Sequence, residues 1–328
     1  MNKSANTADS ERYAIGAATV SLVLADNIRD QEPENSERRK KMDRVIVEKQ
    51  QLYETAVAQY AKTTSDRSFD PSYPTLSLNA VKKWDAEQKC TLLIDAYFSN
   101  PFLPYELSYS TKVFEKKVFE KAWSDLGDKL DVKESLLKEI RDSTKAAKSA
   151  HRHIDWLKIG LGGTGFAALV AVGGLFVAPV LGGMLGGAAG LSGAAAVSHG
   201  LALLGGGSLA AGGAGMAGGM WLVTAAAAGT AGLFATTAQV AFSMGKQQFM
   251  TEVVKLQVSL KVRVAEQQMS VAVAQSKIGE LQEQRKKLEE ILEEERQLND
   301  KNSQRLKDLE AKVQAVTDAL KWLGKEVA

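Results

Sequence analysis

The chain has 328 residues, of which 41 are Lys or Arg and 39 are Asp or Glu, and its formal net charge is +2. All charged residues lie in two flanks, 1–158 and 246–328, where acids and bases are interspersed, so the one-sided basic surface that binds nucleic acid is not encoded and no nucleic-acid partner is expected. Cys90 is the only cysteine, which excludes an intrachain disulfide and is interpreted as a half-buried helix residue.

The start of the chain does not have the pattern of a signal peptide, because Asp9, Glu11 and Arg12 interrupt its apolar residues. We therefore expect the protein to reach a membrane from a soluble form, either a cytoplasmic one or one secreted by another route. Apolar residues at helical spacing predict the first helix over residues 10–30, with Ser10 as its N-cap.

The remainder of the first flank is predicted to complete a helical bundle. A break at Pro33 precedes a second helix, which begins near Ser36. Residues 63–78 contain two prolines and several turn-forming residues, and are predicted to be a loop. Helices are predicted to resume over residues 79–99 and 110–126, and a further amphipathic pattern follows them.

A basic run that includes one tryptophan precedes the uncharged middle of the chain, and a lysine follows it. Cationic side chains bind anionic headgroups, and indole rings prefer the membrane interface. An ordinary solvated helix face is the alternative. The residues predicted to lie at the membrane interface are Lys148, Arg152, Trp156, Lys158 and Lys246.

The middle of the chain, residues 159–245, contains no Asp, Glu, Lys or Arg over 87 residues. One helical crossing of a bilayer needs only about 20 apolar residues. We predict that this region inserts into a lipid bilayer, with two crossings at residues 159–180 and 220–242 favoured over four. The predicted membrane-inserting residues include Gly162, Phe166, Pro179, Gly182, Gly186, Gly190, Gly215, Gly219, Trp221 and Phe234.

Glycines dominate the centre of this uncharged segment, with fifteen of them in residues 181–219. Spacing of four, as at Gly182, Gly186 and Gly190, lets helices approach closely in lipid. Interior glycines cost an aqueous helix up to about 1 kcal/mol each. The segment should therefore be better ordered in lipid than in water, which favours conditional insertion over a permanent anchor.

The second flank, residues 246–328, is predicted to be a long coiled-coil helix. Apolar residues recur in one heptad register from Met250 to Leu323, and the absence of proline favours continuity. A polar stretch from Arg285 to Asn302 leaves a hairpin as the alternative. The residues assigned to the oligomer or bundle seam are Leu281, Leu288, Leu292, Leu309, Val313, Val316, Leu320 and Leu323.

No motif indicates catalysis. Three glycines from Gly160 match G-x-G-x-x-G, but the preceding residues do not read as a strand and no acid follows before Glu252. The histidines and the cysteine lack the spacing of zinc ligands. We therefore expect a protein that is not an enzyme, with no catalytic residues, no cofactor and no metal.

Residues 163–197, GTGFAALVAVGGLFVAPVLGGMLGGAAGLSGAAAV, resemble the membrane-addressing hairpin of apolipoprotein L proteins, in which glycines flank an apolar run that ends in Ala-Pro-Val. Ala178, Pro179 and Val180 hold that place here. The order of helical bundle, hydrophobic hairpin and long helix is also similar to α-helical pore-forming toxins of the cytolysin and tripartite enterotoxin type. These resemblances imply a water-soluble bundle that releases a hairpin into membranes and oligomerises.

The sequence as a whole predicts an all-α protein: an elongated helical bundle with a central Gly/Ala-rich membrane hairpin and a C-terminal coiled coil. The expected function is membrane insertion with pore formation or permeabilisation, as in a toxin or effector. The expected partners are a lipid bilayer and either a second copy of the chain or another helical protein. The alternative is a constitutive integral-membrane scaffold whose coiled coil tethers a partner, with both flanks in the cytoplasm because basic residues border both ends of the uncharged segment.

Overall fold

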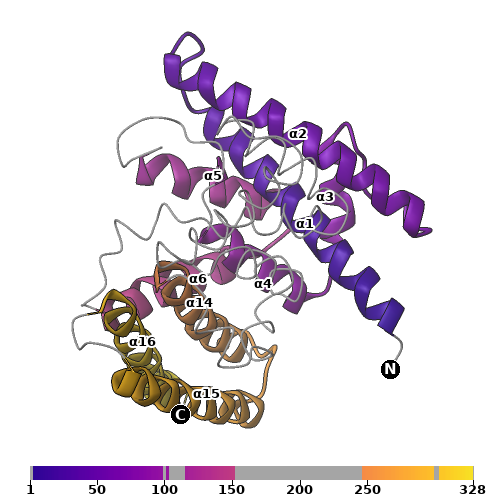
Figure 1. Cartoon of the computed structure of the whole chain (residues 1–328). Helices are drawn as coiled ribbons and strands as arrows, with labels where there is room; N and C mark the ends of the chain where they lie inside the picture. Colours follow the sequence, from indigo (N-terminus) through magenta and orange to yellow (C-terminus); the bar gives the residue numbers. More distant parts are fainter. Residues whose placement is uncertain (1–2, 99–100, 103–114, 152–245, 299–302, 328) are drawn as a thin grey trace.

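The protein is all-helical over the part of the chain that the structure describes, which confirms the predicted fold class (Figure 1). The computed structural model describes residues 3–98, 101–102, 115–151, 246–298 and 303–327. The predicted membrane-inserting residues from Gly162 to Phe234, and the predicted interface residues Arg152, Trp156 and Lys158, lie outside the described residues.

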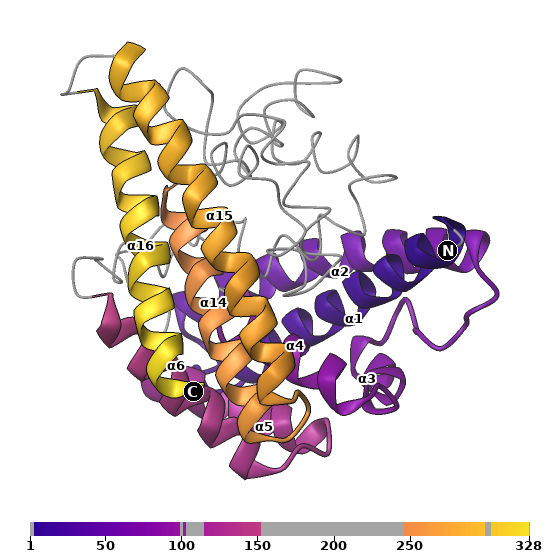
Figure 2. The same ribbon diagram turned by 90° about the horizontal axis from the view of Figure 1, so that it is seen from below.

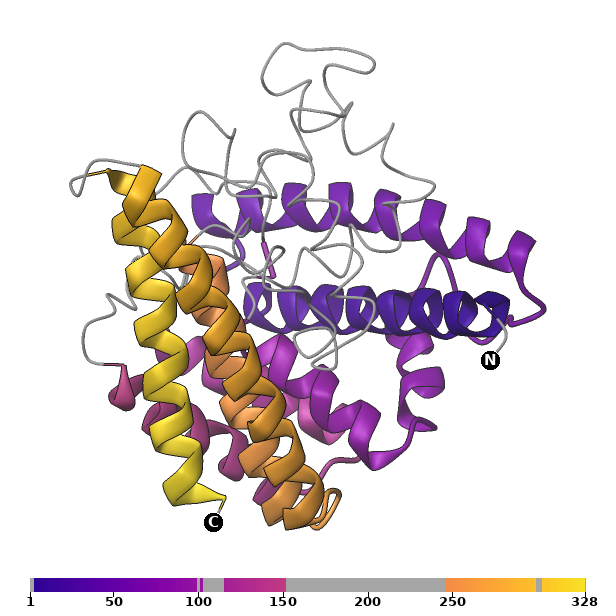
Figure 3. The same cartoon turned by 60° about the horizontal axis from the view of Figure 1, so that its bottom comes forward.

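Six helices are described in the N-terminal half, and the first of them is central to its core. α1 packs against α2, α3, α4 and α5, with α2 alongside it over much of its length (Figures 1 and 3). Every residue from Ile15 to Ala25 is buried, so α1 is enclosed by its neighbours. The six helices are α1 (Lys3–Arg29), α2 (Glu37–Thr63), α3 (Pro74–Lys82), α4 (Ala86–Tyr97), α5 (Lys116–Lys129) and α6 (Glu134–Ala150).

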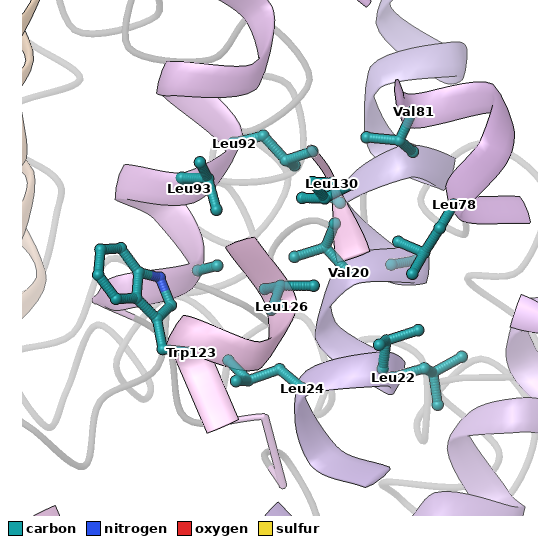
Figure 4. Packing of buried hydrophobic residues seen from close by; sticks show 14 of the residues in the cluster. Val20, Leu22, Leu24, Leu78, Val81, Leu92, Leu93, Trp123, Leu126 and Leu130 are labelled. Carbon is teal, nitrogen blue, oxygen red and sulfur yellow. The ribbon is translucent and has the colours of Figure 1, made fainter. Parts of the chain in front are cut away.

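Aliphatic side chains from four helices meet in the core of this half. Figure 4 shows Val20 and Leu24 of α1 facing Leu126 of α5, while leucines of α3 and α4 approach from either side. Trp123 is fully buried at one end of this group. Burial of apolar area at about 25 cal/mol per Å² makes this cluster the main source of stability for the half.

Several predicted boundaries in this half are wrong. α1 begins at Lys3, so Ser10 lies inside the helix and is not its N-cap. α3 begins within the predicted loop, because Pro74 at a first helical position needs no hydrogen-bond partner for its nitrogen. The helix predicted over residues 79–99 is divided before Asp85, whose carboxylate accepts from the Gln88 amide at 2.7 Å and starts α4.

The structure also tests two other expectations for this half, one about Ser36 and one about Cys90. Ser36 is the N-cap of α2, and its hydroxyl accepts from the Arg39 amide at 3.0 Å. Cys90 lies in a helix, as expected, but it is fully buried rather than half-buried. Burial raises the pKa of its thiol to about 12, so the thiolate is not the populated form at neutral pH.

A close contact between α1 and Trp84 leads to a first prediction. A Cβ atom at Gly16 would overlap the Trp84 ring, which is 5% exposed and stacked on Tyr13 with ring centroids 5.7 Å apart. Because that ring has little room to move, Gly16→Ala should lower the free energy of unfolding by about 1–3 kcal/mol. Gly279→Ala is the matched control, because open space surrounds Gly279 on α15. The control should be neutral or stabilising by up to about 1 kcal/mol in the same chemical denaturation experiment.

The described residues of the second flank form three helices, so the prediction of one continuous helix is wrong. They are α14 (Lys246–Ala265), α15 (Val271–Leu298) and α16 (Gln304–Glu326), and α15 runs antiparallel to the other two (Figure 2). α15 ends at Leu298, inside the polar stretch where a hairpin was the alternative. α14 ends where Gln267 adopts a φ of 57°, which lets the Gln268 amide donate to the Arg263 carbonyl at 2.8 Å. Ser303 starts α16 by accepting from the Leu306 amide at 3.2 Å. The heptad spacing of apolar residues resumes in α15 and α16, because these helices pack through the same apolar face against the core that they share.

The eight seam residues lie together in the core that α14, α15 and α16 share. Val313 and Leu320 are partly buried against this core, and the other six residues are buried within it. The heptad pattern fails at the first break, where Gln267 is exposed and Val271 is 47% exposed. The spacing of apolar residues therefore predicted which face of these helices is packed, but it did not predict where each helix begins and ends.

Candidate functional site: the helix that follows the uncharged segment

Two helices in contact border the uncharged segment in the sequence. α6 ends at Ala150, shortly before residue 159, and α14 begins at Lys246, directly after residue 245. α6 and α14 pack against each other, and α6 also contacts α16 (Figure 2). The attachment points of residues 159–245 therefore belong to one packed unit.

α14 is buried around almost its whole circumference, because it contributes to two cores. Val254, Val258 and Val262 face the N-terminal core. Phe249 and three further apolar residues of α14 belong to the core that it shares with α15 and α16. Its apolar side chains therefore pack against both cores, and α14 joins the two halves. We call it the junction helix.

A buried ionic cluster connects the junction helix to α4 and α1. The Lys255 side chain is 4% exposed, and its Nζ lies 2.9 Å from Asp95 Oδ1 on α4 and 3.3 Å from Glu252 Oε1 one turn away. The Tyr13 hydroxyl on α1 donates to Asp95 Oδ2 at 2.9 Å. We refer to Tyr13, Asp95, Glu252 and Lys255 as the ionic cluster. It places two carboxylates around a single ammonium.

Burial and charge act in opposite directions within the ionic cluster. Burial by itself would lower the pKa of Lys255, but the carboxylates of Asp95 and Glu252 outweigh burial and raise it. Burial, supported by repulsion from Asp95, raises the pKa of Glu252 despite the attraction of Lys255. Burial and the neighbouring Asp95 also raise the pKa of Tyr13 well above its ordinary value. Lys255 is therefore charged and Tyr13 neutral over the physiological range, and Glu252 is the acid in the cluster that is costly to ionise.

Two further polar contacts fix the junction helix. His151, which caps α6, lies with its Nε2 2.7 Å from the Gln257 side-chain oxygen, and both residues are fully buried. Arg263 forms an ion pair with Glu87 at the start of α4. The histidine contact joins the last described residue before the uncharged segment directly to the helix that follows the segment.

The described members of the predicted membrane interface differ from each other. Lys148 is partly buried, and its ammonium lies 5.1 Å from the centre of the Phe98 ring. Burial, together with the nearby Lys116, lowers its pKa. Lys246 is exposed at the beginning of the junction helix. The Lys148 side chain therefore packs against the protein, and it is not one of a row of free basic residues at a membrane interface.

The ionic cluster was not predicted from the sequence. Glu252 and Lys255 are three residues apart, which is a common surface pairing, and Asp95 is 160 residues from Lys255. The detectable signal is that Lys255 lies in a stretch of the sequence rich in valine and leucine, with Val254 and Leu256 as immediate neighbours. A lysine in such a stretch needs a buried partner.

Within the described ranges, none of the helices is both long enough and apolar enough to cross a membrane. The same ranges hold no group of three or more His, Cys, Asp or Glu side chains placed to bind a metal ion. Comparisons of the chain with protein-family models, with curated proteins and with solved structures found no match.

Proposed function

We propose that the protein inserts residues 159–245 into lipid bilayers and forms a pore or otherwise permeabilises the membrane, while its helical flanks stay in water. The observation that carries the proposal is the run of 87 residues without a formal charge between two flanks that hold every charged residue of the chain. Charged side chains are expensive in hydrocarbon, and the flanks place theirs where water is present. The glycine spacing at Gly182, Gly186 and Gly190 supplies a means for the inserted helices to associate.

In more detail, we propose that the protein consists of an N-terminal bundle, a central membrane hairpin and a C-terminal coiled-coil element. The contact between α6 and α14 supports the hairpin, because a segment with both ends on one folded body must return to the side from which it entered. Its number of crossings is then even, and two crossings of about 20 residues fit comfortably within 87. The packed core of α14, α15 and α16 supports a stalk on the aqueous side.

The second candidate function is a constitutive integral-membrane scaffold that tethers a partner through its C-terminal helices. The lysines on both sides of the uncharged segment favour it, since they place both flanks in the cytoplasm for a permanently inserted protein. A scaffold needs crossings that are only hydrophobic. A pore also needs close and specific contacts between its helices, and this difference separates the two candidates experimentally.

The test is Gly186→Leu in the full-length protein, assayed for dye release from liposomes and for co-sedimentation with the same liposomes. We expect release to be abolished, because the leucine side chain separates helices that pack through glycine, while binding persists because leucine is apolar. The matched control is Gly324→Leu, since open space surrounds Gly324 on α16. The control should release dye at the wild-type rate.

Two results would decide against the proposal. Dye release by Gly186→Leu at the wild-type rate, with normal binding, would favour the scaffold. Wild-type protein that binds liposomes but never releases dye would exclude permeabilisation. A variant lacking residues 159–245 should no longer bind vesicles, and retained binding would move the membrane-binding element to one of the flanks.

A further inference from the structure

The junction helix is attached to α4 through a cluster whose charges do not balance. Lys255 Nζ contacts Asp95 Oδ1 at 2.9 Å and Glu252 Oε1 at 3.3 Å, so one ammonium serves two carboxylates. The side chains of Lys255, Glu252 and Asp95 are 4%, 18% and 23% exposed. With all three groups ionised, the cluster holds a net charge of −1 in a largely buried place.

We propose that the ionic cluster is a proton-dependent latch, in which uptake of one proton tightens the attachment of the junction helix to α4. Protonation of one carboxyl leaves one carboxylate for one ammonium, so the buried net charge falls to zero. Buried charges are tolerated when they are paired, and an excess charge is not. The latch should therefore hold the junction helix more firmly in mild acid than at alkaline pH.

The groups that face Glu252 are few, and they come from several elements. Among the described residues, the charges that act on its carboxyl are Lys255 on its own helix and Asp95 on α4. Tyr13 of α1 faces the cluster as a neutral hydroxyl that donates to Asp95. Cys90 of α4 lies close enough to influence Tyr13, but it is a neutral thiol at physiological pH. Glu252 is accordingly the site of proton uptake.

The direction of the effect follows from the raised pKa of Glu252. The folded protein takes up this proton at a higher pH than the unfolded chain, whose glutamate titrates near the ordinary value of 4.5. The stabilisation is therefore absent above the pKa of the folded state, grows as the pH falls through that value, and is complete below 4.5. An ordinary exposed glutamate contributes no such gain.

The experiment compares thermal unfolding of full-length wild type and Glu252→Gln at pH 8 and pH 5. The amide mimics the protonated carboxyl, so at pH 8 the variant should unfold at a higher temperature than wild type, by on the order of 3 °C. At pH 5, where most of the stabilisation has been gained, the difference between the two unfolding temperatures should be much smaller than at pH 8. Hydrogen exchange of the α14 amides, corrected for the intrinsic pH dependence, should show slower exchange at pH 5 in wild type only.

Two further variants make the result specific. Asp95→Asn keeps an oxygen that can accept from Tyr13 and removes the second carboxylate, so its unfolding temperature should change less between pH 8 and pH 5 than that of wild type. Glu283→Gln is the matched control, because Glu283 is 63% exposed beside Lys286 on α15. It should behave as wild type at both pH values. Equal pH responses of wild type, Glu252→Gln and Asp95→Asn would overturn the latch.

The latch concerns helices that the structure describes, whereas its use in controlling membrane insertion rests on the proposed function. Dye release by wild type and Glu252→Gln, measured at both pH values, separates the two ideas. If the thermal shifts appear and neither protein releases dye, the latch is supported and the proposed function fails. If dye is released and the thermal shifts are missing, the proposed function is supported and the latch fails.

Discussion

Leu323→Asp should destabilise the protein by about 4 kcal/mol, because it places a carboxylate in the core that α14, α15 and α16 share. Leu323 is fully buried and belongs to the cluster that contains Leu309 and Val316. The acid one turn along, Glu326, is paired with Lys261 at 3.3 Å and adds repulsion to the new charge. The midpoint of thermal unfolding should fall by roughly 10 °C, as measured by circular dichroism.

Val273→Asp provides the matched control for this substitution. Val273 lies on α15 in the same group of helices, but it is 48% exposed, so an aspartate there stays hydrated. Its unfolding midpoint should differ from that of wild type by less than about 2 °C. Equal midpoints for Leu323→Asp and wild type would show that the shared core is not packed in solution.

Lys49→Met should stabilise the protein at neutral pH, which is the opposite of the usual result of a core substitution. Lys49 is fully buried on α2, where its ammonium donates to the Ser21 hydroxyl at 3.1 Å and to the Pro101 carbonyl. Burial lowers the pKa of Lys49 from 10.5 to about 7, and each unit corresponds to about 1.4 kcal/mol. Methionine removes this penalty and leaves two acceptors without a donor, so we expect a net gain of about 2–3 kcal/mol at pH 7.

The gain from Lys49→Met should depend on pH in a defined direction. Between pH 7 and pH 10.5 the unfolded chain binds a proton that the folded core does not, so the stability of the wild type rises with pH across that window. Methionine has no proton to bind, so its advantage should be full below pH 7 and fall as the pH rises. Toward pH 10.5 it should become a loss, because the wild-type penalty is then gone and the two acceptors still have no donor. Lys62→Met, at an exposed position of the same helix, should change the stability little at either pH. A gain that is independent of pH would contradict the assignment of the penalty to the buried amine.

The apolar pattern of the sequence was enough to predict the class of the fold and the packed faces of its helices. The heptad register assigns Leu309, Val316 and Leu323 to one seam, and all three are buried in the shared core. The heptad register did not predict the turn after Ala265, and the cause is simple. That turn contains neither Gly nor Pro, and Gln267 takes the left-handed conformation without a signal in the sequence.

The polar interior was harder to predict, because its partners are distant in sequence. Helical spacing from Ile46 to Tyr53 does place Lys49 on the buried face of α2, so this lysine was detectable as an exception to the pattern. The register likewise placed Gln257 on the packed seam, but nothing indicated that His151 would lie against it. Contacts of this kind depend on how the helices cross, which local periodicity does not specify.

The position of the junction helix affects how the chain folds during synthesis. Residues 1–151 contain most of one core, yet that core is completed by Val254, Val258 and Val262, which emerge from the ribosome about 100 residues later. At 5–20 residues per second, the delay is on the order of ten seconds. Throughout that interval the apolar side chains that α14 covers lack their partners, and Asp95 lacks its ion pair with Lys255, while the uncharged part of the protein is being made. The N-terminal core is therefore completed only after the whole uncharged segment has been made.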